Sequence, residues 1–136
     1  MNPILIVGAL LGLLAVAFGA LAEHLLLPGL EEAAFRRIDV AMDFHRFGAL
    51  IVTAIGLVLL AVEEPSRRRA LFWAGGLLAA GTILFSFTIY VSDMTEIALP
   101  GPLTPLGGLL QLAGWAALVR VGRLSRRIGS GRNNLA

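Results

Sequence analysis

Cysteine and lysine are absent from the 136-residue chain, and charged residues of any kind are scarce. Without cysteine the protein has no disulfide, thiolate metal site, iron–sulfur cluster or cysteine nucleophile. Charged residues make up 15% of the chain and hydrophobic residues 57%, and the mean hydropathy is +0.84. An average soluble domain is about 25% charged and about half apolar. The imbalance excludes an ordinary soluble domain, intrinsic disorder, a coiled coil and a typical nucleic-acid binder.

Four stretches without charge account for the hydrophobic excess: residues 2–22, 47–62, 70–92 and 97–119. Because about 20 apolar residues cross a bilayer as a helix, we predict an all-α integral membrane protein. Its four-transmembrane-helix bundle comprises helices at about 3–27, 42–63, 68–92 and 104–127. They form a single domain over 1–128, followed by a disordered tail over 129–136. The first stretch is expected to be retained, because no basic residue precedes it as in a signal peptide.

The segment between the first two spans has a different pattern. Pro28-Gly29 marks a turn, and Leu30, Ala34, Ile38 and Ala41 then recur at helical spacing between charged residues. This pattern is typical of an amphipathic helix. We predict an external amphipathic helix over about 30–42 that lies at the outer membrane surface and continues into the second span.

The arginine distribution predicts the orientation. All 11 basic residues are arginines. If the N-terminus is cytoplasmic, eight of them lie inside and three outside, namely Arg36, Arg37 and Arg46. The positive-inside rule therefore favours a multi-pass protein of the cell inner (plasma) membrane with both termini in the cytoplasm.

Small residues on the predicted spans indicate close helix packing. Helices approach closely in a bilayer where small residues face one another. The candidate packing positions are Gly8, Gly12, Gly19, Gly76, Gly107 and Gly108. Packing within the chain is the preferred interpretation, and a face for self-association is the alternative.

Polar side chains from all four spans fall near the outer membrane face. The candidate ligand-binding or structural cluster consists of Glu23, His24, Asp43, His45, Arg46, Ser86, Tyr90, Asp93 and Thr104. Ionisable groups near the apolar phase are costly, so they pair with one another or line a site. Gln111, in the interior of the last span, is interpreted as a polar contact between helices.

Two histidines leave several interpretations open. His24 and His45 are weak candidates for a metal site with Asp43 or Asp93, because no compact ligand spacing is present. They are also candidates for a proton-linked pair titrating at about pH 6.5. The simplest interpretation is that each makes structural hydrogen bonds. No cofactor is predicted.

Four motifs in order resemble the family of small membrane proteins called domain of unknown function 423, which is similar to the eukaryotic transmembrane protein 256 family. The matching segments are residues 15–25 (AVAFGALAEHL), 44–45, 81–86 with Tyr90, and 104–108 with Gly114-Trp115. Departures are Ala22-Glu23 in place of Gly-Ala, and Phe87-Thr88 in place of Gly-Ser. The resemblance implies a four-helix membrane protein without an established activity. It marks His24, His45, Ser86, Tyr90, Thr104 and Pro105 as motif positions.

No serine-hydrolase, zinc-protease, phosphate-loop or dinucleotide-binding motif occurs in the sequence, which favours a protein without enzymatic activity. The favoured function is an accessory or assembly subunit of a larger membrane complex, or a binder of a lipid-like molecule at the outer polar cluster. The alternative is a small transporter, channel or proton-linked sensor that uses His24, His45 and Glu23. A membrane enzyme or metal protein is the third hypothesis. Expected partners are the lipid bilayer and other membrane subunits or a second copy, without nucleic acid.

Overall fold

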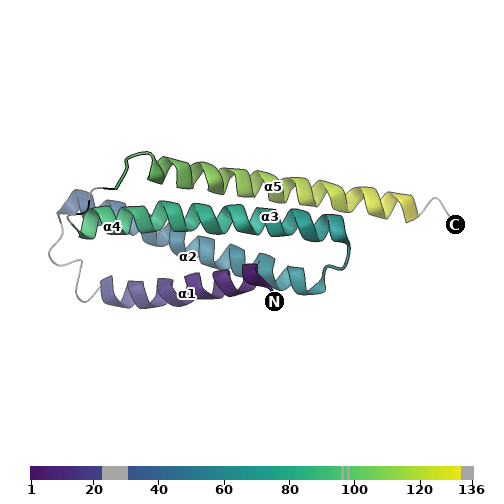
Figure 1. Ribbon diagram of the computed structural model, residues 1–136, viewed down its shortest axis with the longest axis horizontal. Coiled ribbons are helices and arrows are strands. Elements are labelled where there is room, and N and C mark those ends of the chain that lie inside the picture. Colours follow the sequence, from purple (N-terminus) through teal and green to yellow (C-terminus); the bar gives the residue numbers. More distant parts are fainter. Residues whose placement is uncertain (23–30, 96, 98, 133–136) are drawn as a thin grey trace.

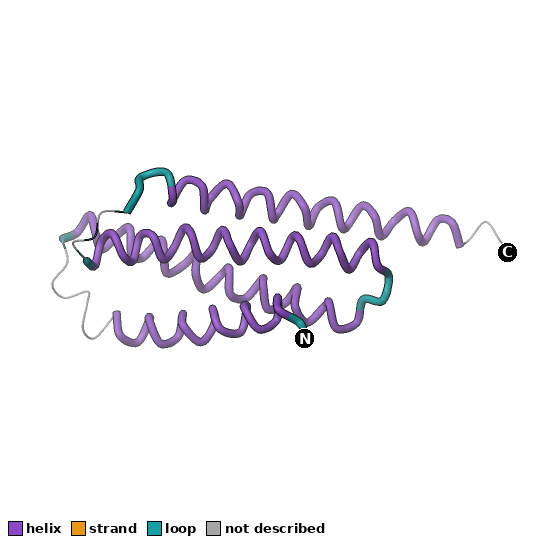
Figure 2. Tube along the Cα trace, in the orientation of Figure 1, coloured by secondary structure: helices purple, strands orange, loops and turns teal. Residues whose placement is uncertain are grey.

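The computed structural model consists of antiparallel helices that run back and forth along one long axis (Figure 1). It describes residues 1–22, 31–95, 97 and 99–132, with side chains as far as Arg123. The elements are α1 (Pro3–Leu21), α2 (Glu32–Ala61), α3 (Pro65–Thr82), a π-helical segment η3 (Ile83–Phe87), α4 (Thr88–Met94) and α5 (Leu103–Arg132). The described part is helical with short loops and contains no strand (Figure 2). Helix α1 begins, and α5 ends, on the side of the molecule where the turn between α2 and α3 lies (Figure 1).

Side-chain caps start two of the helices. Asn2 accepts a hydrogen bond from the backbone N–H of Leu5, and Pro3 occupies the first turn of α1. Glu64 accepts hydrogen bonds from the N–H groups of Ser66 and Arg67 at the start of α3. These caps satisfy donors that a helix start leaves unpaired.

The predicted external helix and second span form one continuous helix, α2. No proline or glycine interrupts residues 32–47, so nothing in the backbone ends the helix between them. Its 30 residues extend for about 45 Å at 1.5 Å per residue, which is longer than a hydrocarbon core of about 30 Å. The amphipathic part packs inward through Ile38, Ala41 and Met42, which are buried with Tyr90 of α4.

Differences at other boundaries are small. The third predicted span corresponds to α3, η3 and α4 in sequence, over Pro65–Met94. Helix α5 begins at Leu103, one residue before the predicted start at about 104, so Thr104 lies inside its first turn. The backbone of α5 continues past Gly129 to Arg132, into the tail expected to be disordered. Residues 133–136 lie outside the described residues, as do residues 23–27 of the first predicted span.

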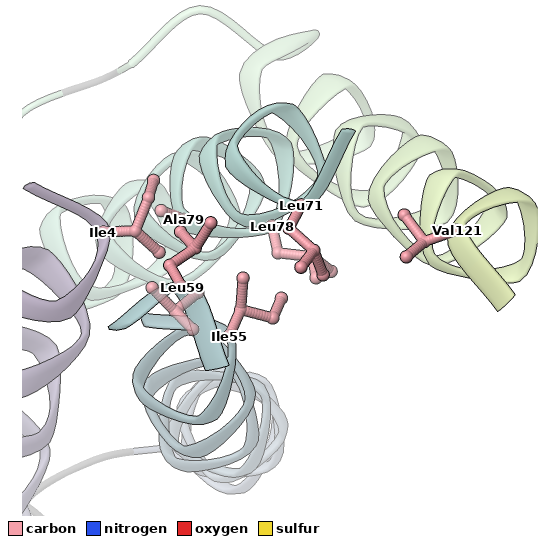
Figure 3. Packing of buried hydrophobic residues seen from close by; sticks show 8 residues of the cluster. Ile4, Ile55, Leu59, Leu71, Leu78, Ala79 and Val121 are labelled. Carbon is pink, nitrogen blue, oxygen red and sulfur yellow. The ribbon is translucent and has the colours of Figure 1, made fainter. Parts of the chain in front are cut away.

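The helices pack in the order α1, α2, α3, α5. The most extensive packing joins α1 to α2 and α3 to α5, and α2 packs against α3 between these pairs. Helix α5 packs mainly along α3. A cluster of buried hydrophobic side chains fills this arrangement, including Ile4, Ile55, Leu71 and Leu78 (Figure 3). The packing order leaves grooves between α1 and α2 and between α2 and α5.

Glycines mark several of the closest helix approaches. A Cβ atom on Gly8 would lie 2.5 Å from the backbone nitrogen of Thr53, and one on Gly107 would lie 2.5 Å from that of Phe85. Both positions are among the predicted packing glycines. Further glycines that make approaches of the same kind are Gly48 against Thr82, Gly56 against Leu5, Gly75 against Ile4, Gly81 against Gln111 and Gly114 against Leu78.

The remaining predicted packing glycines correct that expectation. A Cβ atom on Gly12, Gly76 or Gly108 would meet no atom within 4 Å, so these three make no close helix contact in the described chain. A Cβ atom on Gly19 would lie 3.3 Å from Nη2 of Arg46, at the end of that side chain. Sequence spacing shows which glycines share one face of a helix but not which neighbouring helix, if any, that face contacts. Spacing alone therefore did not separate the glycines at close helix contacts from those in open space.

Three helical stretches of the described chain are long and apolar enough to cross a membrane: Pro3–Leu21, Glu32–Ala61 and Pro65–Met94. Helix α5 is as long as α2 but is not among them. The all-helical fold and the presence of membrane-spanning helices are therefore confirmed.

Candidate functional site

His45 and Tyr90 form a buried polar pair between α2 and α4. His45 is 1% exposed and Tyr90 6% exposed, and the Tyr90 hydroxyl lies 3.3 Å from Nδ1 of His45. The Phe18 ring of α1 stacks on Tyr90 with its centroid 4.1 Å away. The Phe87 ring lies 5.2 Å from the imidazole. Three helices and η3 thus enclose one hydrogen-bonding pair in apolar surroundings.

Two hydroxyl groups are buried on the adjoining part of the third helix. Thr82 and Ser86 are fully buried, and neither hydroxyl has a hydrogen-bond partner in the described chain. Nε2 of His45 is also buried and makes no hydrogen bond of normal geometry in the described chain. Ser86 lies in η3, and π-helical turns of this kind often occur at functional sites. Such groups are costly in apolar surroundings unless a partner satisfies them.

Arg46 of α2 has a partly exposed side chain at the surface of the helix bundle. Its guanidinium is 3.5 Å from the Asp43 carboxylate, and the side chains of the two residues are 47% and 72% exposed. Arg46 lines the groove between α1 and α2, whose volume is about 620 Å³. The other residues of this groove are Gly8, Ala9, Gly12, Ala15, Val16, Ala49, Leu50, Thr53, Ala54 and Leu57. A cation therefore borders an otherwise almost entirely apolar groove.

The groove on the other side of Arg46 lies between α2 and α5. Its lining residues are Asp43, Phe44, Arg46, Phe47, Leu50, Gln111 and Trp115, around a volume of about 510 Å³. Gln111 is buried, and its Nε2 has no hydrogen-bond partner in the described chain. The sequence interpretation of Gln111 as a contact between helices missed this groove position. Its isolation as a polar residue within an apolar span was the available signal.

Asp93 is not part of the His45 pair. It accepts hydrogen bonds of 2.8 Å from both Nε and Nη2 of Arg37, and thereby ties α4 to the first turns of α2. Thr104 is partly buried in the first turn of α5. Glu23 and His24 lie outside the described residues. Among the residues that are described, no group of three His, Asp or Glu side chains is placed to hold a metal ion.

Known proteins with similar sequences are membrane proteins. A family model described as protein of unknown function (DUF423) matches residues 18–108. A UPF0382 membrane protein of Staphylococcus haemolyticus is 32% identical over 88% of this chain and 93% of its own length. YwdK, a UPF0382 membrane protein of Bacillus subtilis, is 30% identical over 88% of this chain and 94% of its own. The UPF0382 inner membrane protein YgdD of Escherichia coli K12 is 31% identical over 90% of this chain and 92% of its own length. No solved structure matches.

Proposed function

The chain belongs to the family described as protein of unknown function (DUF423), and we propose that this member is a non-enzymatic membrane protein that binds an anionic lipid. The groove between α1 and α2 would hold one acyl chain. Arg46 would hold the phosphate group. This is the lipid-binding form of the function expected from the sequence, placed at one of the grooves of the fold.

The position of Arg46 carries this proposal. A guanidinium beside the apolar phase is costly unless a partner satisfies its donors. Asp43, at 3.5 Å on the same helix, is a distant partner. A phosphate accepts two parallel N–H bonds from a guanidinium, which makes arginine well suited to phosphate recognition. Gly12 and Ala15 keep the groove wide enough for a chain beside that charge.

The same proposal includes the membrane topology. We infer that α5 is the fourth crossing, that both termini are cytoplasmic and that the first turns of α2 lie at the outer surface. The arginine distribution supports this orientation, and in Figure 1 α1 begins and α5 ends on the side of the turn between α2 and α3. Because the chain has no cysteine, an introduced cysteine is unique and reports its own side.

Labelling of intact spheroplasts with a membrane-impermeant maleimide tests this topology. We expect labelling of Thr95→Cys and none of Ser66→Cys or Gly122→Cys until the membrane is opened. All three positions are exposed. Labelling of Gly122→Cys together with Thr95→Cys would show that α5 does not cross. Labelling of Ser66→Cys and Gly122→Cys without Thr95→Cys would reverse the orientation.

Native mass spectrometry of the purified protein tests the lipid site. Phosphatidylglycerol and phosphatidylcholine are added in equal amounts to the detergent-solubilised protein. We expect a preference for phosphatidylglycerol that Arg46→Gln abolishes. Arg36→Gln is the control, because Arg36 pairs with Glu32 on the exposed face of the same helix. Equal binding of both lipids, or a preference that survives Arg46→Gln, would refute the proposal.

Filling the groove is an independent test with a matched control. Gly12 lines the groove and Gly76 does not, and neither would place a Cβ atom within 4 Å of another residue. Gly12→Leu and Gly76→Leu therefore introduce the same side chain at two positions where the added Cβ atom has open space. Only Gly12→Leu is expected to weaken phosphatidylglycerol binding. Equal lipid binding by the two variants would place the lipid elsewhere.

A second candidate is a proton-linked sensor or transporter, which the burial of His45 beside Tyr90 favours. A titratable imidazole held between α2 and α4 is able to couple protonation to their packing. His45→Gln should then remove a pH-dependent change in intrinsic fluorescence while the protein remains folded. A fluorescence response that His45→Gln leaves intact would eliminate this candidate.

A further inference from the structure

The groove between α2 and α5 contains a buried hydrogen-bond donor without an acceptor. Gln111 is 7% exposed, and its Nε2 is buried without a partner in the described chain. An amide N–H buried in apolar surroundings without an acceptor is destabilising. Gln111 also lines the groove, so a rotation about its last side-chain bond turns Nε2 toward an occupant. The amide would therefore gain an acceptor from a bound molecule.

Aromatic rings form much of the remaining lining. Phe47 of α2 and Trp115 of α5 both line the groove and pack against each other, with ring centroids 6.0 Å apart and an interplanar angle of 32°. Phe44 also lines the groove, and its ring packs on Phe85 at 4.8 Å. Aromatic side chains in this arrangement favour a flat ring that stacks or packs edge to face. The groove thus combines aromatic walls with one buried donor.

The size and surroundings of the groove fit a small membrane-soluble ligand. Its volume of about 510 Å³ lies within the range of about 300–1,000 Å³ that is usual for ligand pockets. Such pockets are mostly apolar with a few well-placed polar groups. Because α5 packs mainly along α3, the groove is not covered by another helix of the described chain. A ligand dissolved in the bilayer can enter from the side.

We propose that this groove binds the head group of a quinone, with Nε2 of Gln111 donating a hydrogen bond to a ring carbonyl oxygen. The planar ring would lie against Phe47 and Trp115, and the apolar tail would extend into the bilayer. A phospholipid acyl chain has no planar ring that could stack on these aromatic side chains. This site adjoins the proposed lipid groove, with which it shares Arg46 and Leu50 of α2, and its occupant goes beyond that function.

The two tryptophans allow a direct binding measurement. Trp115 lines the groove and Trp73 lies on α3 away from it. In detergent, Trp73→Phe leaves Trp115 as the reporter and Trp115→Phe leaves Trp73. Decylubiquinone is expected to quench Trp115 with saturation near one quinone per protein. Its effect on Trp73 should rise linearly, as expected for simple partition into the micelle.

Gln111→Met separates the hydrogen bond from the shape of the groove. Methionine has nearly the same length but no donor, so half-saturation of Trp115 quenching should require at least tenfold more quinone. The thermal unfolding midpoint should not fall, because the Gln111 donor has no partner to lose. Decylbenzene, which has the ring and tail without carbonyls, should bind wild type and Gln111→Met equally.

Three results would overturn the proposal. One is linear quenching of both tryptophans, and another is unchanged half-saturation in Gln111→Met. The third is displacement of the quinone by phosphatidylglycerol at equal concentration, which would make this groove a phospholipid site. Arg46 and Leu50 line both grooves, whereas Gly12 lines only the lipid groove and Gln111 only this one. Gly12→Leu and Gln111→Met therefore test the two proposals separately.

Discussion

The Tyr90 hydroxyl lies 3.3 Å from Nδ1 of His45 and joins the last part of the third helical stretch to α2. Both residues are buried, and Phe18 of α1 covers the Tyr90 ring. The pair therefore links three parts of the chain at one end of the molecule. In an apolar environment such a bond has few competitors, since no water is available to replace it.

Tyr90→Phe should reduce stability through this bond alone. The substitution keeps the ring stacked on Phe18 and leaves Nδ1 without its partner. Interhelical hydrogen bonds in membrane proteins contribute about 0.6 kcal/mol on average and about 1.7 kcal/mol at most. We expect a loss within that range in the free energy of unfolding, measured by titration with a denaturing detergent. In a His45→Leu background the same substitution should have little effect, and an equal loss in both backgrounds would contradict the assignment.

Gly48→Ala should disrupt the contact between α2 and α3. A Cβ atom at this position would overlap the Thr82 side chain. Overpacking of this kind costs about 1–3 kcal/mol, which thermal unfolding in detergent would detect. Thr82→Ala in the same chain removes the two atoms that overlap most and should recover part of the loss. Gly12→Ala, which has open space, is the control, and equal stability of the two glycine variants would be inconsistent with this interface.

Asp93→Asn should loosen the start of α2. The Asp93 carboxylate accepts two hydrogen bonds from Arg37, and the bond pair spans two helices. Hydrogen exchange should therefore increase over residues 32–41 when the charge is removed. The exchanged pair Arg37→Asp with Asp93→Arg should slow it again. Arg36→Ala serves as the control, because the Arg36 pair with Glu32 lies within α2. Unchanged exchange in Asp93→Asn would show that packing alone holds these turns.

Glu64→Gln should alter the response of the protein to acid. Hydrogen bonds from the Ser66 side chain and from the Arg67 backbone hold the pKa of the Glu64 carboxyl below its usual value. Because the folded protein favours the charged form, the contribution is complete above the unfolded pKa. It is lost as the pH falls through the lower folded value. Wild type should lose thermal stability between about pH 5 and pH 3 more than Glu64→Gln does.

Glu63→Gln is the control for this pH dependence. It removes a carboxylate from the same turn but leaves the cap on Ser66 and Arg67 in place. Its acid profile should therefore follow that of the wild type. If Glu64→Gln retains the wild-type slope, the cap makes no contribution to the acid response.

Much of the secondary structure was predictable from local pattern. The charge-free stretches fall on α1, on the second half of α2, on α3 with η3 and α4, and on α5. The family resemblance is confirmed by the matching family model and by the curated relatives. The start of α5 was missed by one residue, because Thr104-Pro105 is a helix-start signal and the structure uses the turn before it. The sequence predicted that the amphipathic segment continues into the second span, and in the structure both belong to the single helix α2.

The polar residues were less predictable. Proximity to one membrane face placed Asp93 and His45 in one expected cluster, but each has a different partner. Arg37, which the sequence assigned only to an amphipathic surface, is the partner of Asp93. Gln111 was recognised as unusual without any indication of the groove it lines. Residue spacing gives the depth of a side chain along a helix, whereas its partner depends on which faces meet.

By itself the sequence determined that this chain is helical and embedded in a membrane, because a helix enters a bilayer according to its own length and polarity. Only the tertiary structure decided which small residues pack. It brought Gly8 and Gly48 against neighbouring helices and left Gly12 open beside Arg46. A bilayer supplies no hydrophobic drive between helices, so fine differences in packing select the faces that meet. Those differences depend on all helices together and are not readable from any one of them.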